Sequence, residues 1–160
     1  IILRYFNAVG YDISGRILQI EKNPSNLFPI IMETIFGKRN LLEVFGDDYS
    51  TNDGTCERDY IHVSDLASAH LCSQKYLNSG KGSLITNLAT GKKYSVFDVI
   101  NSCIKKCKKV IPYKIVHRRE SDAPILYSES IISEKELKWK PQITSLDKII
   151  NSMIEVYKRN

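Results

Sequence analysis

Four residues in three parts of the sequence are suited to binding an anion. Arg58 lies where a turn enters an expected strand, a position from which side chains often reach ligands. Arg118 and Arg119 follow an expected strand at residues 110–116, and a guanidinium can bind phosphate through two parallel hydrogen bonds. Asn26 opens an expected helix, where unpaired backbone N–H groups favour a phosphate or another anion. These residue types predict anion binding.

Two aromatic residues, Phe45 and Tyr60, are candidates for stacking on a base or a sugar. Several of these candidates also have an interpretation that needs no ligand. Phe45 can belong to the core, Asn26 can be a helix cap, and Arg58 can be the ion-pair partner of Asp59. Taken singly, therefore, none of them establishes a site.

The motifs of common catalytic sites are absent from the sequence. Neither of the glycine-rich loops G-x-G-x-x-G and G-x-x-x-x-G-K-[ST] occurs, so no dinucleotide or triphosphate site follows from motif alone. None of the nine tyrosines is followed by a lysine four residues later, which excludes the Tyr-x-x-x-Lys acid–base pair. The motifs H-E-x-x-H and G-x-S-x-G are also missing. We therefore expect no catalytic residue and no metal site in this chain.

The apolar pattern is that of an α/β protein, in which short apolar runs alternate with amphipathic helices. The expected strands cover residues 1–6, 41–45, 59–63, 84–88 and 110–116. The expected helices cover about 26–36, 64–77, 96–107, 132–137 and 146–157. Ser64 and Ser95 are the expected N-caps of the second and third of these helices, because a serine hydroxyl accepts a hydrogen bond from the first turn.

Composition and charge restrict the class of protein. A chain of 160 residues with 42% hydrophobic and 26% charged residues is neither a disordered tail nor a collagen-like repeat. No apolar run approaches the roughly 18 residues that cross a membrane. The start Ile1-Ile2-Leu3 has no basic n-region, so we expect no secretion signal. The four cysteines form no zinc-binding pattern, which favours free thiols in the cytoplasm. The net charge of +5 includes the cluster Lys105–Lys109, but no aromatic residues or reader motif accompany it, so we expect no nucleic-acid partner.

Six segments of the chain resemble the C-terminal half of the UDP-glucose 4-epimerase family, whose members are extended short-chain dehydrogenases/reductases. The segments are LRYFN (3–7), NLFP (26–29), VFGDDYSTNDGTCERDYIHVSDLASAH (44–70), NLATGKKYSV (87–96), IPYKIVHRRESDAP (111–124) and LKWKP (137–141). The resemblance extends over essentially the whole chain, and the string DYSTNDGT is similar to the 4-epimerases in particular.

This resemblance implies a fold and assigns substrate binding and catalysis to different halves of the protein. Residues 1–160 would be the UDP-sugar-binding half of an α/β, Rossmann-type enzyme, and strands 1–7 and 84–88 would complete the parallel sheet of an N-terminal NAD-binding domain that this chain lacks. The start at Ile1, without Met, also suggests a fragment. In this family NAD takes a hydride from C4 of a UDP-hexose and returns it to the other face of the 4-keto sugar. The catalytic Tyr and Lys belong to the missing half, so we expect this chain alone to be inactive.

The resemblance also assigns roles to individual residues. Contacts to the UDP-hexose are expected from Asn7, Asn26, Leu27, Phe45, Arg58, Tyr60, Val96, Arg119 and Asp122. Contacts to NAD are expected from Tyr5 and Phe6, and Leu126 occupies the position that admits or excludes N-acetylated sugars. The full-length protein is expected to be a cytoplasmic homodimer. Two alternatives stay open: a non-catalytic nucleotide-sugar-binding module, and a related epimerase that acts on a UDP-N-acetylhexosamine.

Overall fold

The computed structural model describes all residues, 1–160, and contains nine strands, four α-helices and one π-helix. The strands are β1 (Ile2–Arg4), β2 (Asn7–Val9), β3 (Leu42–Phe45), β4 (Glu57–Arg58), β5 (Tyr60–His62), β6 (Ile85–Asn87), β7 (Tyr94–Ser95), β8 (Tyr113–Val116) and β9 (Ile125–Leu126). The helices are α1 (Leu27–Ile35), α2 (Val63–Asn78), α3 (Val96–Cys107), the π-helix η1 (Ser133–Leu137) and α4 (Leu146–Tyr157). The α/β class expected from the sequence is confirmed.

The strands form short pairs, most of them parallel. β1 pairs with β6, β2 with β5, β3 with β8 and β4 with β9 in parallel, and only β4 and β7 are antiparallel. The single strand expected over the first residues is therefore two strands, because the chain bends at Phe6 and changes its pairing partner from β6 to β5. Parallel pairing is typical of α/β proteins, whose strands are connected through helices.

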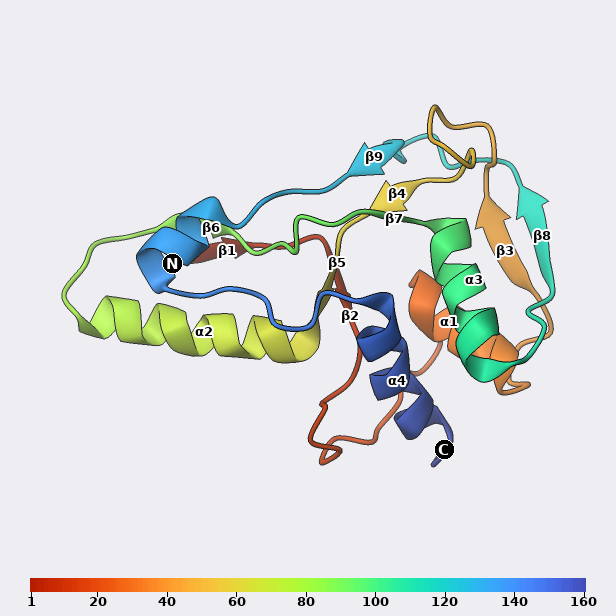
Figure 1. Cartoon of the computed structure of the whole chain (residues 1–160), viewed down its shortest axis with the longest axis horizontal. Helices are drawn as coiled ribbons and strands as arrows, with labels where there is room; N and C mark the ends of the chain where they lie inside the picture. The colour runs from red at the N-terminus through yellow and green to blue at the C-terminus, as the bar shows by residue number, and fades with distance from the viewer.

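Two clusters of buried apolar side chains define two lobes, which Figure 1 shows side by side with β2 and β5 between them. The larger cluster joins α1, α3, α4 and β3, and the smaller one joins α2, η1 and the start of the chain. Successive side chains of a strand point to opposite faces. In β5, Tyr60 accordingly belongs to the larger cluster and Ile61 to the smaller one. This strand therefore connects the two cores.

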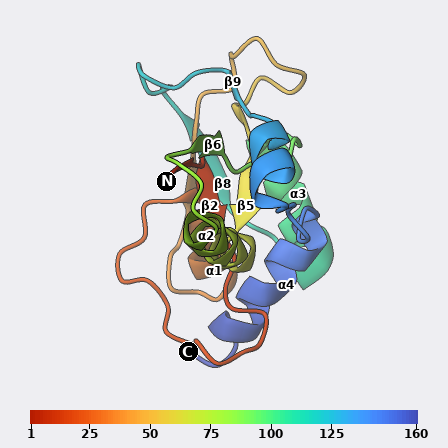
Figure 2. The same ribbon diagram turned by 90° about the vertical axis from the view of Figure 1, so that its left-hand side faces the viewer.

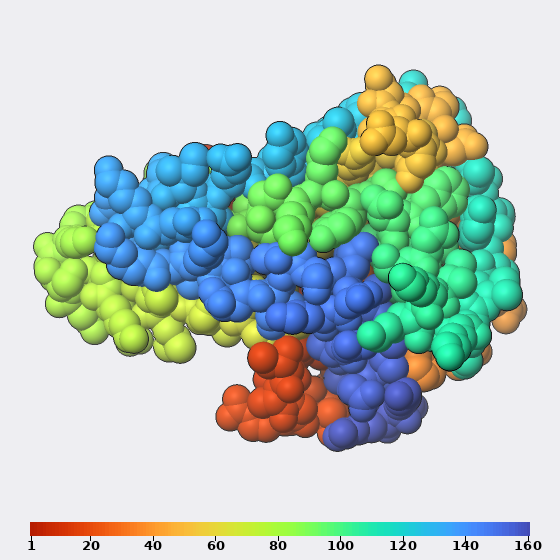
Figure 3. Space-filling view, in the orientation of Figure 1, coloured from red at the N-terminus to blue at the C-terminus, as the bar shows by residue number.

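The loop at residues 10–25 extends beside the C-terminal end of α4, as Figures 1 and 2 show from two directions. The side-chain amide of Asn160 donates a hydrogen bond to the carbonyl oxygen of Leu18 at 2.8 Å, which joins this loop to the end of the chain. In the space-filling view of Figure 3 the loop projects from the body of the molecule next to α4. None of the helices has both the length and the apolar composition that a membrane span requires.

The helix starts agree only in part with the sequence-based expectations. Ser95 caps α3 as predicted, in a capping box in which its hydroxyl accepts from the N–H of Asp98 and the Asp98 carboxylate accepts from the N–H of Ser95. The prediction that Ser64 caps α2 is wrong. The helix begins at Val63, and the cap is the buried side chain of His62, whose Nδ1 accepts from the N–H of Ser64 at 3.1 Å.

This cap requires a neutral imidazole at position 62. Because Nδ1 of His62 accepts a hydrogen bond, its other nitrogen, Nε2, carries the proton and lies 3.2 Å from the hydroxyl of Ser152 in α4. Gly10 makes this arrangement possible, since a Cβ there would come within 2.4 Å of the imidazole. Burial lowers the pKa of His62, because removal from water disfavours the charged form.

We expect the free energy of unfolding to fall as the pH drops below about 6.5, the ordinary pKa of histidine. Below that value the unfolded chain takes up a proton that folded His62, with its lowered pKa, does not bind. The variant His62→Asn keeps a cap acceptor but cannot titrate. Urea denaturation of both proteins at pH 7.5 and 5.5 is expected to show a larger acid-induced loss of stability in the unmodified chain than in His62→Asn. An equal loss in both proteins would contradict this assignment.

Candidate functional site

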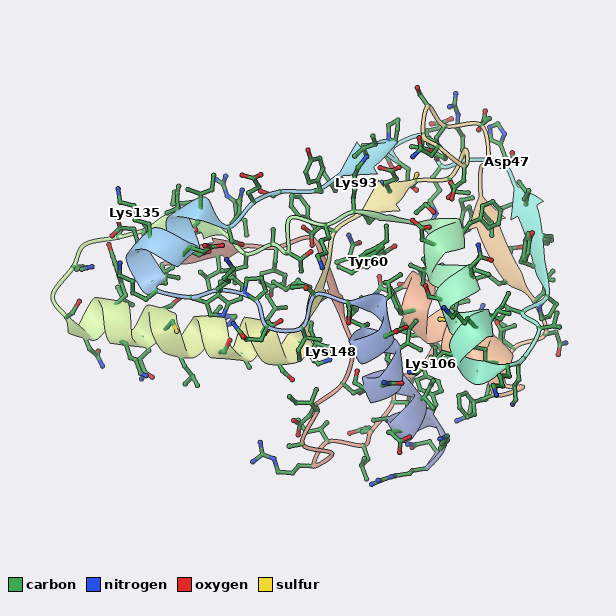
Figure 4. All side chains as sticks on the ribbon, viewed as in Figure 1. Asp47, Tyr60, Lys93, Lys106, Lys135 and Lys148 are labelled. Carbon is green, nitrogen blue, oxygen red and sulfur yellow. The ribbon has the colours of Figure 1, made fainter.

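A cavity of about 400 Å³ opens in the larger lobe, where the start of α1, the end of β3 and the pair β2–β5 converge. It is lined by residues from well-separated parts of the chain. All nine residues that the sequence nominated as substrate contacts are among them: Asn7, Asn26, Leu27, Phe45, Arg58, Tyr60, Val96, Arg119 and Asp122. Phe6, nominated for the cofactor, also lines this cavity. Figure 4 labels Tyr60 near the middle of the molecule.

Two nominated residues do not line the cavity. Tyr5 precedes the bend at Phe6, and the residue is 44% exposed. Leu126 lies in β9, opposite Arg58 of β4 in the parallel register, and is 39% exposed. If Tyr5 contacts NAD and Leu126 admits or excludes N-acetylated sugars, they do so from the surface beside the cavity.

Arg58 is held rigidly at the wall of the cavity. One of its terminal nitrogens donates to the carbonyl oxygen of Ala123 at 2.7 Å and to that of Glu57 at 3.0 Å. The other lies 3.5 Å from the carboxylate of Asp122, and the Arg58 side chain is only 13% exposed. The interpretation of Arg58 as the ion-pair partner of Asp59 is therefore wrong; its partner is Asp122. The guanidinium is oriented before any ligand arrives.

Asp59 points away from the Arg58 side chain and binds a different part of the chain. Its carboxylate accepts hydrogen bonds from the N–H of Thr90 at 3.1 Å, the hydroxyl of Thr90 at 2.7 Å and the N–H of Gly91 at 3.1 Å. Burial raises the pKa of Asp59, and these donors oppose that shift because they favour the ionised form. The residue fastens the start of β5 to the loop after β6, and so keeps Arg58 and Tyr60 in place on either side of it.

The two consecutive arginines after β8 take different directions. The guanidinium carbon of Arg119 lies 3.9 Å from the ring centroid of Phe45, a cation–π contact inside the cavity. Arg118 instead lies over the ring of Tyr49, at 5.6 Å, and its guanidinium is 3.9 Å from the carboxylate of Asp48. Only Arg119 lines the cavity, although the sequence treats both as anion-binding candidates.

The start of α1 presents unused hydrogen-bonding groups to the cavity. Asn26 is the N-cap by position, with extended backbone angles, but its side chain makes no capping hydrogen bond. No acidic side chain lies in the first turn of this helix. Asn26 is thus the helix cap by position, as the sequence allowed, but not through its side chain. Its amide, together with the backbone N–H groups of the first turn, is available to an anionic ligand.

The segment Asp53-Gly54-Thr55 attaches α3 to the cavity. The carboxylate of Asp53 accepts hydrogen bonds from the hydroxyl of Thr55 at 2.7 Å and from that of Ser95. The Thr55 hydroxyl in turn accepts from the N–H of Val96 at 3.2 Å. Gly54 has a φ of +79°, and a Cβ there would lie 1.9 Å from the carbonyl oxygen of Asp47. This network places Val96 against the cavity.

Sequence reasoning missed other residues of the wall: Ala8, Val9, Ser25, Phe28, Ile30, Leu42, Glu43, Val44 and Cys56. Most are apolar core residues. The sequence pattern of a core residue is the same whether or not it adjoins a cavity, so the pattern could not identify them. Cys56 is buried and lies two residues before Arg58. This proximity to a candidate anion-binding residue is the only feature of the local sequence that could have identified Cys56 as part of the wall.

Comparison with known proteins places this arrangement in a family. The sequence model of the NAD dependent epimerase/dehydratase family matches residues 1–89, which is more than half of the chain. The chain belongs to this family. Its α/β fold with parallel strand pairs is the fold that the solved epimerase structures share with it.

Relatives from this family match nearly the whole of the chain. The UDP-glucose 4-epimerase of Mus musculus is 41% identical over 161 residues, which covers 100% of this chain and 46% of the mouse protein. The structure of the UDP-glucose 4-epimerase from Brucella ovis in complex with NAD has a TM-score of 0.89 and 39% identity, covering 94% of this chain and 46% of that one. The structure of the UDP-glucose 4-epimerase from Bifidobacterium longum in complex with NAD+ and UDP has a TM-score of 0.87 and 37% identity. The match covers 99% of this chain and 47% of that one. The chain thus spans about half the length of its relatives.

Proposed function

We propose that this epimerase-family chain is the UDP-sugar-binding half of an NAD-dependent UDP-glucose 4-epimerase, an isomerase that interconverts UDP-glucose and UDP-galactose. The observation that carries the proposal is the convergence of the nine nominated residues on one cavity, with a fixed guanidinium at Arg58 and a second one at Arg119. The relatives named above are 4-epimerases, and the B. longum structure contains NAD+ and UDP.

In this proposal each part of the cavity binds one part of the nucleotide sugar. Arg58, Arg119 and the start of α1 bind the diphosphate, because charge-assisted hydrogen bonds to phosphate are strong. Phe45 and Val96 contact the uracil. Asp122 accepts from a ribose hydroxyl while it continues to hold Arg58 in position. None of these residues is a proton-transfer catalyst, so their task is to bind the substrate and orient C4 of its sugar.

The residues of this chain fit NAD only at its nicotinamide end. Tyr5 and Phe6 follow β1, both are exposed, and Phe6 lies next to Asn7 at the cavity. Two uncovered aromatic side chains at this point are suited to a flat ring. When bound, NAD supplies the acceptor and later the donor of the C4 hydride. No glycine-rich loop is present to bind its pyrophosphate, so we assign that contact to the N-terminal half of the protein.

The pair β1–β6 supports the proposal that such a half exists. Ile2 and Ile85 lie opposite each other in the parallel register and are both exposed. An uncovered apolar face and unpaired strand edges are costly in water. We propose that the parallel sheet of the NAD-binding domain covers them. For the whole protein we further propose a homodimer, with its interface outside this chain, and a cytoplasmic location, in keeping with its free cysteines.

The expected result for the chain alone is binding without turnover. Calorimetric titration is expected to show that it binds UDP, whereas incubation with NAD and UDP-galactose yields no UDP-glucose. Addition of the polypeptide that carries the glycine-rich loop and the Tyr-x-x-x-Lys pair is expected to produce turnover. Turnover by the chain alone would contradict the assignment of the catalytic pair to the other half.

Two further outcomes separate this proposal from its alternatives. A non-catalytic binding module would bind UDP but would stay inactive when joined to the other half. An enzyme that acts on N-acetylated sugars would convert UDP-N-acetylglucosamine in the joined form, and substitution of Leu126 by a bulky tyrosine would suppress that conversion selectively. Absence of UDP binding would contradict the cavity as the site.

A further inference from the structure

The ring of Phe45 already has a partner in the cavity. The guanidinium carbon of Arg119 lies 3.9 Å from the ring centroid, a stacking distance, and both side chains line the same cavity. Arg119 takes part in none of the ion pairs of the chain, in contrast to Arg58, which is bound by Asp122 and by the carbonyl oxygen of Ala123. One arginine of the site is thus fixed, and the other is held by an aromatic ring.

A flat base that stacks on Phe45 from the cavity competes with this guanidinium. An aromatic face accommodates one planar partner at van der Waals distance, because both partners approach the same cloud of π electrons. A ligand that takes this face must therefore displace Arg119. A ligand that also carries a diphosphate offers the displaced guanidinium a stronger partner than the ring, since a bidentate contact to phosphate is charge-assisted.

We propose that Arg119 is a specificity-determining residue, which covers the base-stacking face of Phe45 until a diphosphate draws it away. This inference rests on the proposed function, because it takes the ligand to be a nucleoside diphosphate with its base at Phe45. The consequence is that the site selects UDP over uridine. Uridine must displace the guanidinium without compensation, whereas UDP replaces one contact of Arg119 with a better one.

Arg118 is the matched control for this proposal. It adjoins Arg119 in the sequence and carries the same charge, but it lies over Tyr49 near Asp48 and does not line the cavity. Both side chains are at the surface, so either alanine variant removes one charge without opening the core. A general effect of net charge on a nucleotide would appear in both variants.

The test is a set of NMR titrations of the 160-residue chain and its variants Arg119→Ala and Arg118→Ala with UDP and with uridine. For Arg119→Ala we expect UDP affinity to fall about tenfold or more, the value of a lost charged hydrogen bond. Uridine affinity is expected to rise about two- to fivefold, because the competing cation–π contact is gone. Arg118→Ala is expected to change the ratio of the two affinities less than about twofold.

A second readout follows the side chain itself. In the free chain the Nε–H proton of Arg119 is expected to show an upfield ring-current shift, which addition of UDP removes. A Phe45→Leu variant without ligand is expected to lack the shift, which assigns it to this ring.

Three results would overturn the inference. They are weaker uridine binding by Arg119→Ala, an unchanged ratio of UDP to uridine affinity in that variant, and a ring-current shift that persists with UDP bound. In each case the unmodified chain still binds UDP, so the proposed function stands. If the unmodified chain binds neither ligand, the proposed function fails, and the inference fails with it.

Discussion

Replacement of Arg58 by alanine is expected to weaken UDP binding by about a hundredfold or more, the largest effect on binding of any single substitution in this cavity. The substitution removes a preoriented guanidinium and leaves the carboxylate of Asp122 without its partner at the wall. A hydrogen bond to a charged group contributes about 1.5–3 kcal/mol, and here the remaining negative charge of Asp122 also repels the diphosphate. Calorimetric titration with UDP measures the change.

Two further variants make the Arg58 result specific. Arg58→Lys keeps the charge but not the planar fork, so its affinity is expected to lie between those of the unmodified chain and Arg58→Ala. Arg16 is an exposed arginine whose partner is Asp12, at 3.6 Å, and Arg16→Ala is expected to leave the affinity nearly unchanged. UDP binding by Arg58→Ala at the strength of Arg16→Ala would show that Arg58 does not contact the ligand.

Replacement of Asp59 by alanine is expected to lower the free energy of unfolding by about 3–5 kcal/mol. Asp59 is buried, and its loss leaves the N–H and the hydroxyl of Thr90 and the N–H of Gly91 without their acceptor. Asp59→Asn keeps one acceptor oxygen and is expected to lose less. Urea denaturation measures the difference.

The control for Asp59 is a carboxylate of the same type at the surface. Asp48 lies 3.9 Å from Arg118, and its side chain is 64% exposed, so Asp48→Ala is expected to change stability by less than about 1 kcal/mol. A similar small change for Asp59→Ala would show that the hydrogen bonds to Thr90 and Gly91 contribute little to the fold.

Much of the secondary structure could be predicted because it depends on local patterns. The apolar spacing of α4 and the serine cap of α3 are properties of neighbouring residues, and both elements begin and end where the pattern places them. The start of α2 could not be predicted in this way. A serine in position 64 is the ordinary cap, but His62 takes the role because its ring is buried against Ser152, a residue in the last helix.

The candidate site shows the same limit. The residue types at Arg58 and Phe45 and the motifs around them nominated the lining of the cavity, and the resemblance to an epimerase extended the set. The residue types alone do not distinguish Arg119 from Arg118, and it was the resemblance to the family that assigned the contact to Arg119. The difference between them depends on the direction in which each side chain leaves the loop after β8, and so on the aromatic rings of β3 and of the following turn.

By itself, then, the sequence determined the α/β class, the family resemblance and a cavity chemistry of arginines, an amide and aromatic rings. Only the tertiary structure decided how these groups are held. Asp122 binds Arg58, Asp59 binds the loop at Thr90, and Arg119 stacks on Phe45. The physical reason is that each of these contacts joins segments far apart in the chain. Their geometry follows from strand register and core packing, which neighbouring residues do not encode.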